Sequence, residues 1–215
     1  MRFDSNFWQA IDSRYHPELK AIAVERTIRS QEFLFQDKDP YYGFYVIRTG
    51  KFRLFNLNDA GDEATISVLG KDQTIALVPI FTGQSHNHAY CQAIEDNSFY
   101  FFDKNKFISL IKKRTDLLFS IAEMAVDFTL GFRDKYLSVI LQRAEDRIID
   151  FLRELGAETT YVKLPLAKKQ LASLLDITPE SLSRLLNKLK TDKILSETDG
   201  AYRINKYNFT FPSNT

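Results

Sequence analysis

The first half of the chain carries short runs of aromatic and β-branched residues at nearly regular intervals. Clear runs lie at 44–47, 52–55, 65–69 and 99–102, and turn-forming residues such as those at 49–50 and 58–62 separate them. Runs of this kind are typical of short strands, and several in succession predict an antiparallel sandwich or barrel. We therefore expect a β jelly roll between about residues 22 and 102.

The pattern changes to a helical period after Phe107. One apolar stripe consists of Leu117, Ile121, Met124 and Phe128. A neighbouring stripe consists of Leu118, Ala122, Ala125, Phe132 and Tyr136. These stripes predict a long helix over roughly 116–141 that is apolar on more than one face. Such a helix needs a partner besides its own sheet, and a second copy of the chain packed as a coiled coil would supply it. The alternative is a helix buried within one domain.

The last third of the chain has an all-helical pattern followed by a hairpin pattern. We expect helices at 144–155, 167–175 and 179–191, and a small β-hairpin at 194–204. Two short helices joined by a tight link are typical of a helix-turn-helix. Thr178 suits the N-cap of the second helix, and Pro179 suits its first helical position. The fold class is therefore α+β: a β jelly roll, a long dimerisation helix and a C-terminal winged helix-turn-helix.

The helix predicted at 179–191 has an apolar and a polar face. The residues expected to face the core are Leu182, Leu185, Leu186 and Leu189. Glu180, Ser183 and Arg184 point the other way, and these side chains suit the edges of bases in duplex DNA. The remaining predicted DNA contacts are Thr178 and the flanking lysines Lys168, Lys169 and Lys188, which suit phosphates. The alternative is an ordinary solvated helix face.

Charge supports the DNA-binding interpretation locally and not globally. The whole chain has 29 basic and 28 acidic residues. Between residues 163 and 193, however, seven basic residues face three acidic ones, which is an excess of four positive charges. A local basic excess is the expected electrostatic signature of a surface that binds nucleic acid.

Length and composition exclude some other classes of protein. The chain has 215 residues, is 44% hydrophobic and has one cysteine, Cys91. A single cysteine excludes an iron–sulfur cluster held by four cysteines of one chain, and no apolar run reaches the ~20 residues that span a bilayer. We expect a cytoplasmic protein with no membrane partner. The expected domains are 1–115 for effector sensing, 116–141 for dimerisation and hinge, and 142–215 for DNA binding.

The segment 164–189 resembles the helix-turn-helix of the CRP–FNR family of bacterial regulators, and the order of domains is similar to that family over nearly the whole chain. The resemblance implies a homodimer in which Glu180, Ser183 and Arg184 read a palindrome with TTGA-like half-sites. RNA polymerase would be a further partner of an activator. The segment departs from the family at Asp176, where glycine is common.

The N-terminal half departs from the members of this family that bind cyclic nucleotides. Those members carry a Gly-Glu pair for the ribose and an Arg-Ser pair for the phosphate, and the aligned positions here hold Ala76-Leu77 and Asn87-His88. Their base-contacting Thr and Ser positions correspond to Phe132 and Arg133. These six residues are the predicted effector pocket. Because the charged contact to phosphate is missing, we expect a small-molecule or gas effector other than cyclic AMP.

The histidines His86 and His88 can be interpreted in two ways. On a strand they would point to the same side and could share a metal ion, whereas in a surface loop they would be solvated. The loop is the interpretation we adopt, with no metal site. Haem or gas sensing is a variant of the regulator hypothesis, and a hydrophobic small molecule is equally open.

Two different functions for a jelly roll fit the sequence less well. A metal-dependent enzyme of the cupin type would need a further histidine downstream of His88, and the sequence has none. A kinase-type regulatory module would use the sensory domain without DNA, and it would leave the pattern of the last third of the chain unexplained.

Overall fold

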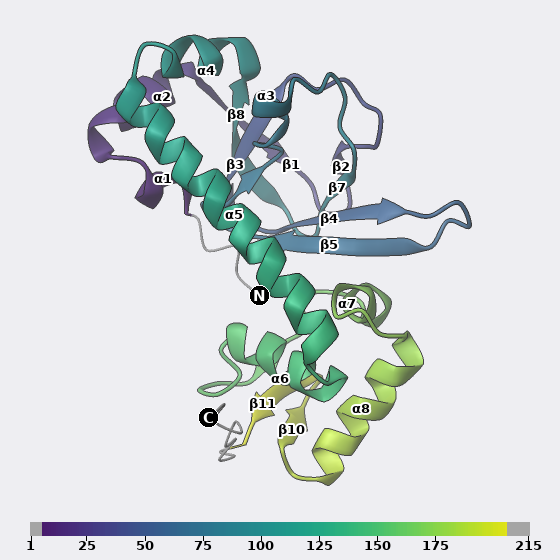
Figure 1. The fold of residues 1–215 in the computed structure, drawn as a ribbon. Coiled ribbons are helices and arrows are strands. Elements are labelled where there is room, and N and C mark those ends of the chain that lie inside the picture. The colour runs from purple at the N-terminus through teal and green to yellow at the C-terminus, as the bar shows by residue number, and fades with distance from the viewer. Residues whose placement is uncertain (1–5, 206–215) are drawn as a thin grey trace. The chain divides into compact units, whose positions relative to one another are not determined.

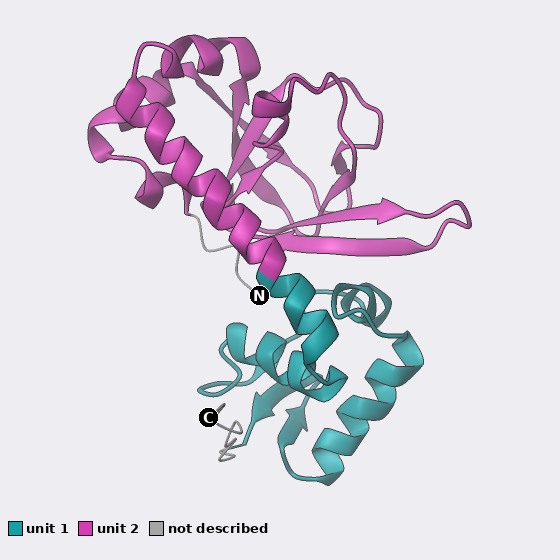
Figure 2. Ribbon diagram, in the orientation of Figure 1, with its two compact units in different colours: residues 1–2, 134–215 teal, residues 3–133 magenta. Residues whose placement is uncertain are grey.

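The computed structural model describes residues 6–205 (Figure 1). Contacts between residues divide the chain into two compact units, one spanning Phe3–Arg133 and the other centred on Asp134–Thr215 (Figure 2). The division falls inside the longest helix, α5 (Thr115–Leu141), which therefore contributes residues to both units. Each unit is described separately below.

The N-terminal unit contains two four-stranded antiparallel sheets. Their strand orders are β1-β8-β3-β6 and β2-β7-β4-β5. The strands are β1 (Ala23–Ile28), β2 (Phe33–Phe35), β3 (Gly43–Thr49), β4 (Phe52–Leu57), β5 (Glu63–Leu69), β6 (Thr74–Ile75), β7 (Tyr90–Ala93) and β8 (Asn97–Asp103). Four of these strands, β3, β4, β5 and β8, coincide with the predicted runs. The non-consecutive order of neighbours confirms the predicted jelly-roll type of sandwich.

The same unit contains helices, several of which were not predicted from the sequence. Its helices are α1 (Phe7–Ala10), the 3-10 turn η1 (Ser13–Tyr15), α2 (His16–Ile22), α3 (Pro79–Thr82), α4 (Lys104–Ile111) and α5. Asn6 caps α1 by accepting hydrogen bonds from the backbone N–H groups of Trp8 and Gln9. Short helices such as α1, with four residues, carry too few apolar positions to show a helical period in the sequence.

An aromatic cluster forms the main core of this unit. Phe44 and Phe102, which are register partners on β3 and β8, stack with ring centroids 4.7 Å apart. Phe107 of α4 meets Phe44 edge-on at 4.7 Å. Phe7 closes the cluster from the N-terminal segment, with its ring 5.6 Å from that of Phe102. All four rings are fully buried, so the N-terminal segment is part of the core.

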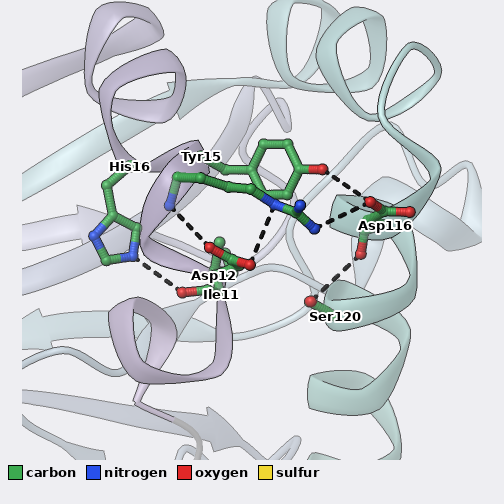
Figure 3. Close-up of polar contacts among 7 residues, drawn as sticks. Ile11, Asp12, Tyr15, His16, Asp116 and Ser120 are labelled. Atoms are coloured by element: carbon green, nitrogen blue, oxygen red, sulfur yellow. Dashed lines mark hydrogen bonds and ion pairs between the residues drawn. The ribbon is translucent and has the colours of Figure 1, made fainter.

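The first turn of α5 is tied to the N-terminal segment by polar contacts (Figure 3). The Asp116 carboxylate accepts hydrogen bonds from the Tyr15 hydroxyl at 3.2 Å and from the Arg14 guanidinium at 3.1 Å. From the same helix, Leu117, Ile121 and Met124 are buried in the aromatic core. The first predicted stripe is thus the face by which α5 packs on its own unit.

The C-terminal unit is a winged helix-turn-helix, as predicted. Its elements are α6 (Ala144–Glu154), β9 (Val162–Lys163), α7 (Lys168–Leu174), α8 (Pro179–Thr191), β10 (Leu195–Thr198) and β11 (Ala201–Ile204). The predicted hairpin is β10-β11, and β9 adds a third antiparallel strand to it. Buried leucines from α7 and α8 share the core with Ile148, Ile149 and Leu152 of α6. No helix within residues 6–205 has both the length and the apolarity that crossing a bilayer requires.

The buried stripe of α5 gives a stability prediction. Leu117→Ala removes a side chain that is 0% exposed, and we expect it to lower the free energy of unfolding by about 2–5 kcal/mol. The matched control is Leu57→Ala at the end of β4, where the side chain is 43% exposed and the expected loss is below about 1 kcal/mol. Chemical denaturation followed by circular dichroism measures both, and equal losses would contradict the packing assigned to α5.

Candidate nucleic-acid interface and ligand cavity

The turn between α7 and α8 is held by backbone geometry. Asp176 has a φ of 54°, the left-handed conformation that aspartate tolerates better than most residues. The backbone N–H of Ile177 donates to the carbonyl of Ala172 at 3.0 Å, and Ala172 is fully buried. A side chain as small as that of alanine allows two helices to approach closely at this point.

Thr178 begins α8 as predicted. Its hydroxyl accepts a hydrogen bond from the backbone N–H of Ser181 at 3.2 Å and lies 3.1 Å from the Ser181 hydroxyl. Pro179 occupies the first helical position, where the missing N–H costs nothing. The Thr178 hydroxyl is therefore engaged in capping the helix, and this role competes with a direct contact to phosphate.

The two faces of α8 separate as the sequence predicts, with one exception. Leu182, Leu186 and Leu189 are buried, whereas Leu185 is only half-buried. Leu185 was predicted to face the core with the other three leucines, and it does so only in part because it lies at the edge of the apolar stripe.

The predicted base-reading residues lie on the outer side of α8. Glu180 and Arg184 are exposed, and Ser183 is half-buried. Among residues 6–205, none of these three side chains has a hydrogen-bond or ion-pair partner. An exposed helix face whose polar groups are not committed to the protein itself can offer donors and acceptors to a major groove.

The lysines around this face differ in their environment. Lys168 and Lys169 are exposed at the start of α7. Lys188, by contrast, forms an ion pair with Glu145 of α6 at 2.5 Å, and this hydrogen bond raises the pKa of its ammonium group. Part of the positive charge of Lys188 is therefore neutralised within the protein. The sequence alone did not reveal this pairing because the partners are 43 positions apart.

Arg147 is a structurally important residue that the sequence analysis missed. From α6 its guanidinium donates to the carbonyls of Gln142 at 2.8 Å and of Leu175 at 3.0 Å, and more weakly to that of Asp176 at 3.4 Å. Gln142 directly follows α5, and Leu175 and Asp176 lie in the turn before α8. One side chain thus joins the last residues of the long helix to the helix-turn-helix.

The N-terminal unit contains a cavity of about 260 Å³. Its lining residues come from the β2-β7-β4-β5 sheet, from β6, from α3 and the loop after it, and from α5. The predicted pocket residues among them are Ala76, Leu77, Asn87, His88 and Phe132. Arg133, the sixth predicted residue, is not among the described residues that line the cavity. Further lining residues that the sequence analysis missed include Phe35, Leu54, Ile66, Met124 and Phe128.

The positions that align with the nucleotide-binding pairs of the family, 76–77 and 87–88, make contacts of their own in this structure. Ala76 adopts a φ of 58°, and its carbonyl accepts a hydrogen bond from the Tyr41 hydroxyl at 2.9 Å. Burial raises the pKa of Tyr41, so this donor stays protonated. Leu77 is 8% exposed and joins the aromatic core. Asn87 is 5% exposed, and its amide donates to the carbonyl of Asp39 at 3.3 Å.

The histidine pair lies in the loop between α3 and β7. His86 is exposed, contacts the Ser85 hydroxyl at 2.9 Å, and is absent from the described lining of the cavity, whereas His88 borders it. The two side chains therefore have different surroundings. Within residues 6–205, no group of three or more histidine, cysteine or acidic side chains is arranged to hold a metal ion.

Cys91 lies in the interior of the same unit. Its side chain is 0% exposed on β7, and burial raises the pKa of its thiol. A thiol that is neither accessible nor ionised is a poor nucleophile and a slow target for oxidants.

Comparison with known proteins places both units in one class. Residues 25–114 match the cyclic nucleotide-binding domain, and residues 146–208 match the Crp-like helix-turn-helix domain. The chain is therefore a DNA-binding regulator of transcription with an N-terminal domain of the cyclic nucleotide-binding type. With both domains present in this order, it belongs to the CRP–FNR family.

Similar proteins are regulators of the same kind. The chain is 24% identical over 182 residues to the fumarate and nitrate reduction regulatory protein of Vibrio cholerae, covering 81% of this chain and 72% of that one. It is 20% identical over 193 residues to an anaerobic regulatory protein of Bacillus subtilis, covering 86% and 81%. A metal-dependent jelly-roll enzyme is not what these relatives indicate.

Solved structures share the fold. The c-di-GMP responsive global regulator CLP of Xanthomonas campestris has a TM-score of 0.77 at 16% identity, covering 91% of this chain and 100% of that one. FixK2 of Bradyrhizobium japonicum has a TM-score of 0.75 at 19% identity, covering 86% and 93%.

The N-cap of α8 gives a second prediction. Thr178→Ala removes the oxygen that accepts from the Ser181 N–H, and we expect it to destabilise the first turn of α8 by about 1 kcal/mol. The result to measure is faster amide hydrogen exchange at Ser181. Thr178→Ser keeps the hydroxyl and should exchange almost as slowly as the unaltered protein; if both variants exchange alike, the hydroxyl is not the cap.

Proposed function

We propose that this protein is a homodimer that reads a DNA palindrome with TTGA-like half-sites and responds to an effector other than cyclic AMP. The observation that carries the proposal is the outer face of α8, where Glu180, Ser183 and Arg184 are free of partners within residues 6–205. The dimer would offer two such helices to major grooves about one helical turn apart.

The three side chains have distinct roles in this proposal. The Arg184 guanidinium can donate two parallel hydrogen bonds to guanine, and the Glu180 carboxylate can accept from the amino group of cytosine. The shorter Ser183 hydroxyl can donate to or accept from a neighbouring base edge. Lys168 and Lys169 supply phosphate contacts, which set affinity without reading sequence. Lys188 joins them only at the cost of weakening its ion pair with Glu145.

The exposed side of α5 supports the homodimer. Large apolar side chains on it that are more than 40% exposed include Phe119, Val126, Leu130, Leu137 and Ile140. Phe119, Val126 and Ile140 recur at multiples of seven positions, and Leu130 and Leu137 are also seven apart. This is the spacing of a coiled-coil seam. A second copy of the same helix provides the apolar surface that would cover it.

Regulation in this proposal is a population shift. The effector binds one arrangement of the α5 helices better than another, and only that difference in affinity can shift the balance. The proposed hinge is Leu141–Arg143, from the last residue of α5 to the residue before α6. The proposal includes action in the cytoplasm and, for an activator, contact with RNA polymerase. Haem is an alternative effector group, which the absorption spectrum of the purified protein would test.

Base reading by Arg184 can be separated from phosphate binding. Arg184→Ala should reduce discrimination between the TTGA-type palindrome and a duplex with one altered guanine pair by about 1–3 kcal/mol. Lys168→Ala should weaken both duplexes alike and make the dependence of affinity on salt less steep. Fluorescence anisotropy with labelled duplexes at several salt concentrations measures both. Equal losses on both duplexes for Arg184→Ala would contradict its role as a base reader.

The dimer interface can be tested with a matched pair of valines. Val126 on α5 is 58% exposed, and Val24 on β1 is 45% exposed. Val126→Glu should place a charge in the coiled-coil seam, shift the sedimenting species to a monomer, and weaken binding to the palindrome by roughly 10²-fold or more, because the second half-site no longer adds affinity. Val24→Glu should change neither. A Val126→Glu variant that stays dimeric would refute this interface.

A further inference from the structure

The cavity of the N-terminal unit is lined mainly by apolar side chains. The strands contribute Phe35, Leu54 and Leu69, and α5 contributes Met124 and Phe128. Phe128 packs against Phe132 with ring centroids 4.9 Å apart. The volume of the cavity, about 260 Å³, is close to the lower end of the ~300–1,000 Å³ range of small-molecule sites.

Positive charge is missing from this lining. No lysine or arginine is among the described residues that border the cavity. Arg53 on β4 is buried, but it is paired with Glu63, donates to the Gln92 side chain at 3.2 Å and lies 3.9 Å from the centre of the Phe55 ring. A phosphate entering the cavity would lose water without gaining a cation, which strongly disfavours an anionic ligand.

The polar lining groups suit a neutral ligand. Ser67 and Thr74 offer hydroxyls, and Gln84 and His88 lie on the exposed loop that borders the cavity. The amide nitrogen of Asn87 is already directed to the carbonyls of Asp39 and Pro40. A few convergent hydrogen-bonding groups in an otherwise apolar wall are typical of sites that orient an uncharged molecule.

We propose that this cavity binds an uncharged, mainly apolar small molecule. The ligand lies between the β2-β7-β4-β5 sheet and α5, its apolar body contacts Met124 and Phe128, and its polar end is directed to the loop that carries Gln84 and His88. The inference rests on the proposed function because it gives the chemical class of the effector. Contact with α5 connects occupancy of the site to the helix on which the dimer depends.

The test compares two dyes that share one scaffold and differ in charge. The neutral dye N-phenyl-1-naphthylamine and its anionic relative 8-anilinonaphthalene-1-sulfonate both fluoresce more strongly in apolar sites. In titrations of the full-length protein, we expect the neutral dye to bind at least about tenfold more tightly than the sulfonate, because burying the charge is costly. Cyclic AMP at millimolar concentration should leave the neutral dye bound.

Two cavity-filling variants and one control locate the dye. Ala125→Phe on α5 and Ala89→Phe in the loop before β7 place a ring in the cavity, and each should weaken the neutral dye about tenfold or more. Ala64→Phe adds the same ring at an exposed position of β5 outside the described lining and should leave binding unchanged. Using two filling variants keeps the test decisive if one of them does not fold.

The outcomes separate this inference from the proposed function. Equal or tighter binding of the sulfonate, displacement of the neutral dye by cyclic AMP, or unaltered dye binding in the folded filling variants would each overturn the inference. So would a complete lack of neutral dye binding. If the same preparation still binds the TTGA-type palindrome, the proposed function survives that loss. If it binds the dye in the cavity and no duplex, the proposed function fails and the ligand class stands.

Discussion

The constraint on which the structure depends is the amount of apolar surface along α5. Leu117, Ile121 and Met124 are buried in the aromatic core of the N-terminal unit, yet other large apolar side chains of the helix remain exposed. One helix therefore packs on the core of its own unit, forms a wall of the cavity through residues such as Phe128, and leaves a further apolar face exposed. Exposed apolar patches of this kind are rare on monomers and mark interaction surfaces.

The sequence predicted the helices and strands whose apolar residues follow a regular pattern over enough positions to be recognised. The long helix was predicted to within a residue at its start, and the bounds of α8 agree fully because Thr178 and Pro179 mark where it begins. The N-terminal segment was not predicted, although Phe7 belongs to the core. Helices such as α1, with only four residues, owe their conformation to a cap and to tertiary packing, and neither produces a periodic signal.

The candidate sites also differ in what the sequence predicts. Residues placed by their spacing along one helix were predicted, whereas contacts between segments far apart in the chain were not. The outward position of Glu180 and Arg184 follows from helical spacing and needs no other part of the chain. The role of Arg147 depends on carbonyls brought together by the fold, and carbonyls carry no sequence signal at all. Five of the six predicted pocket residues border the cavity, since they were located by resemblance to a family. The leucine and phenylalanine side chains opposite them lie on strands, where they look like ordinary core residues.

Two non-glycine residues with left-handed backbone lie at the candidate sites, Asp176 in the turn before α8 and Ala76 at the cavity. Their φ values are 54° and 58°. The resemblance implies that glycine is common at the first position in the family and is present at the second in the members that bind cyclic nucleotides. A residue with a Cβ adopts this conformation at a cost of about 1–2 kcal/mol, so the surrounding structure must compensate, as the hydrogen bond from Tyr41 to the Ala76 carbonyl does. At Asp176 this conformation forms the turn that leads into α8. At Ala76 the next side chain is the buried Leu77, which cannot bind ribose hydroxyls as the glutamate implied by the resemblance would. Leu77 thus adds to the apolar lining on which the proposed ligand class rests.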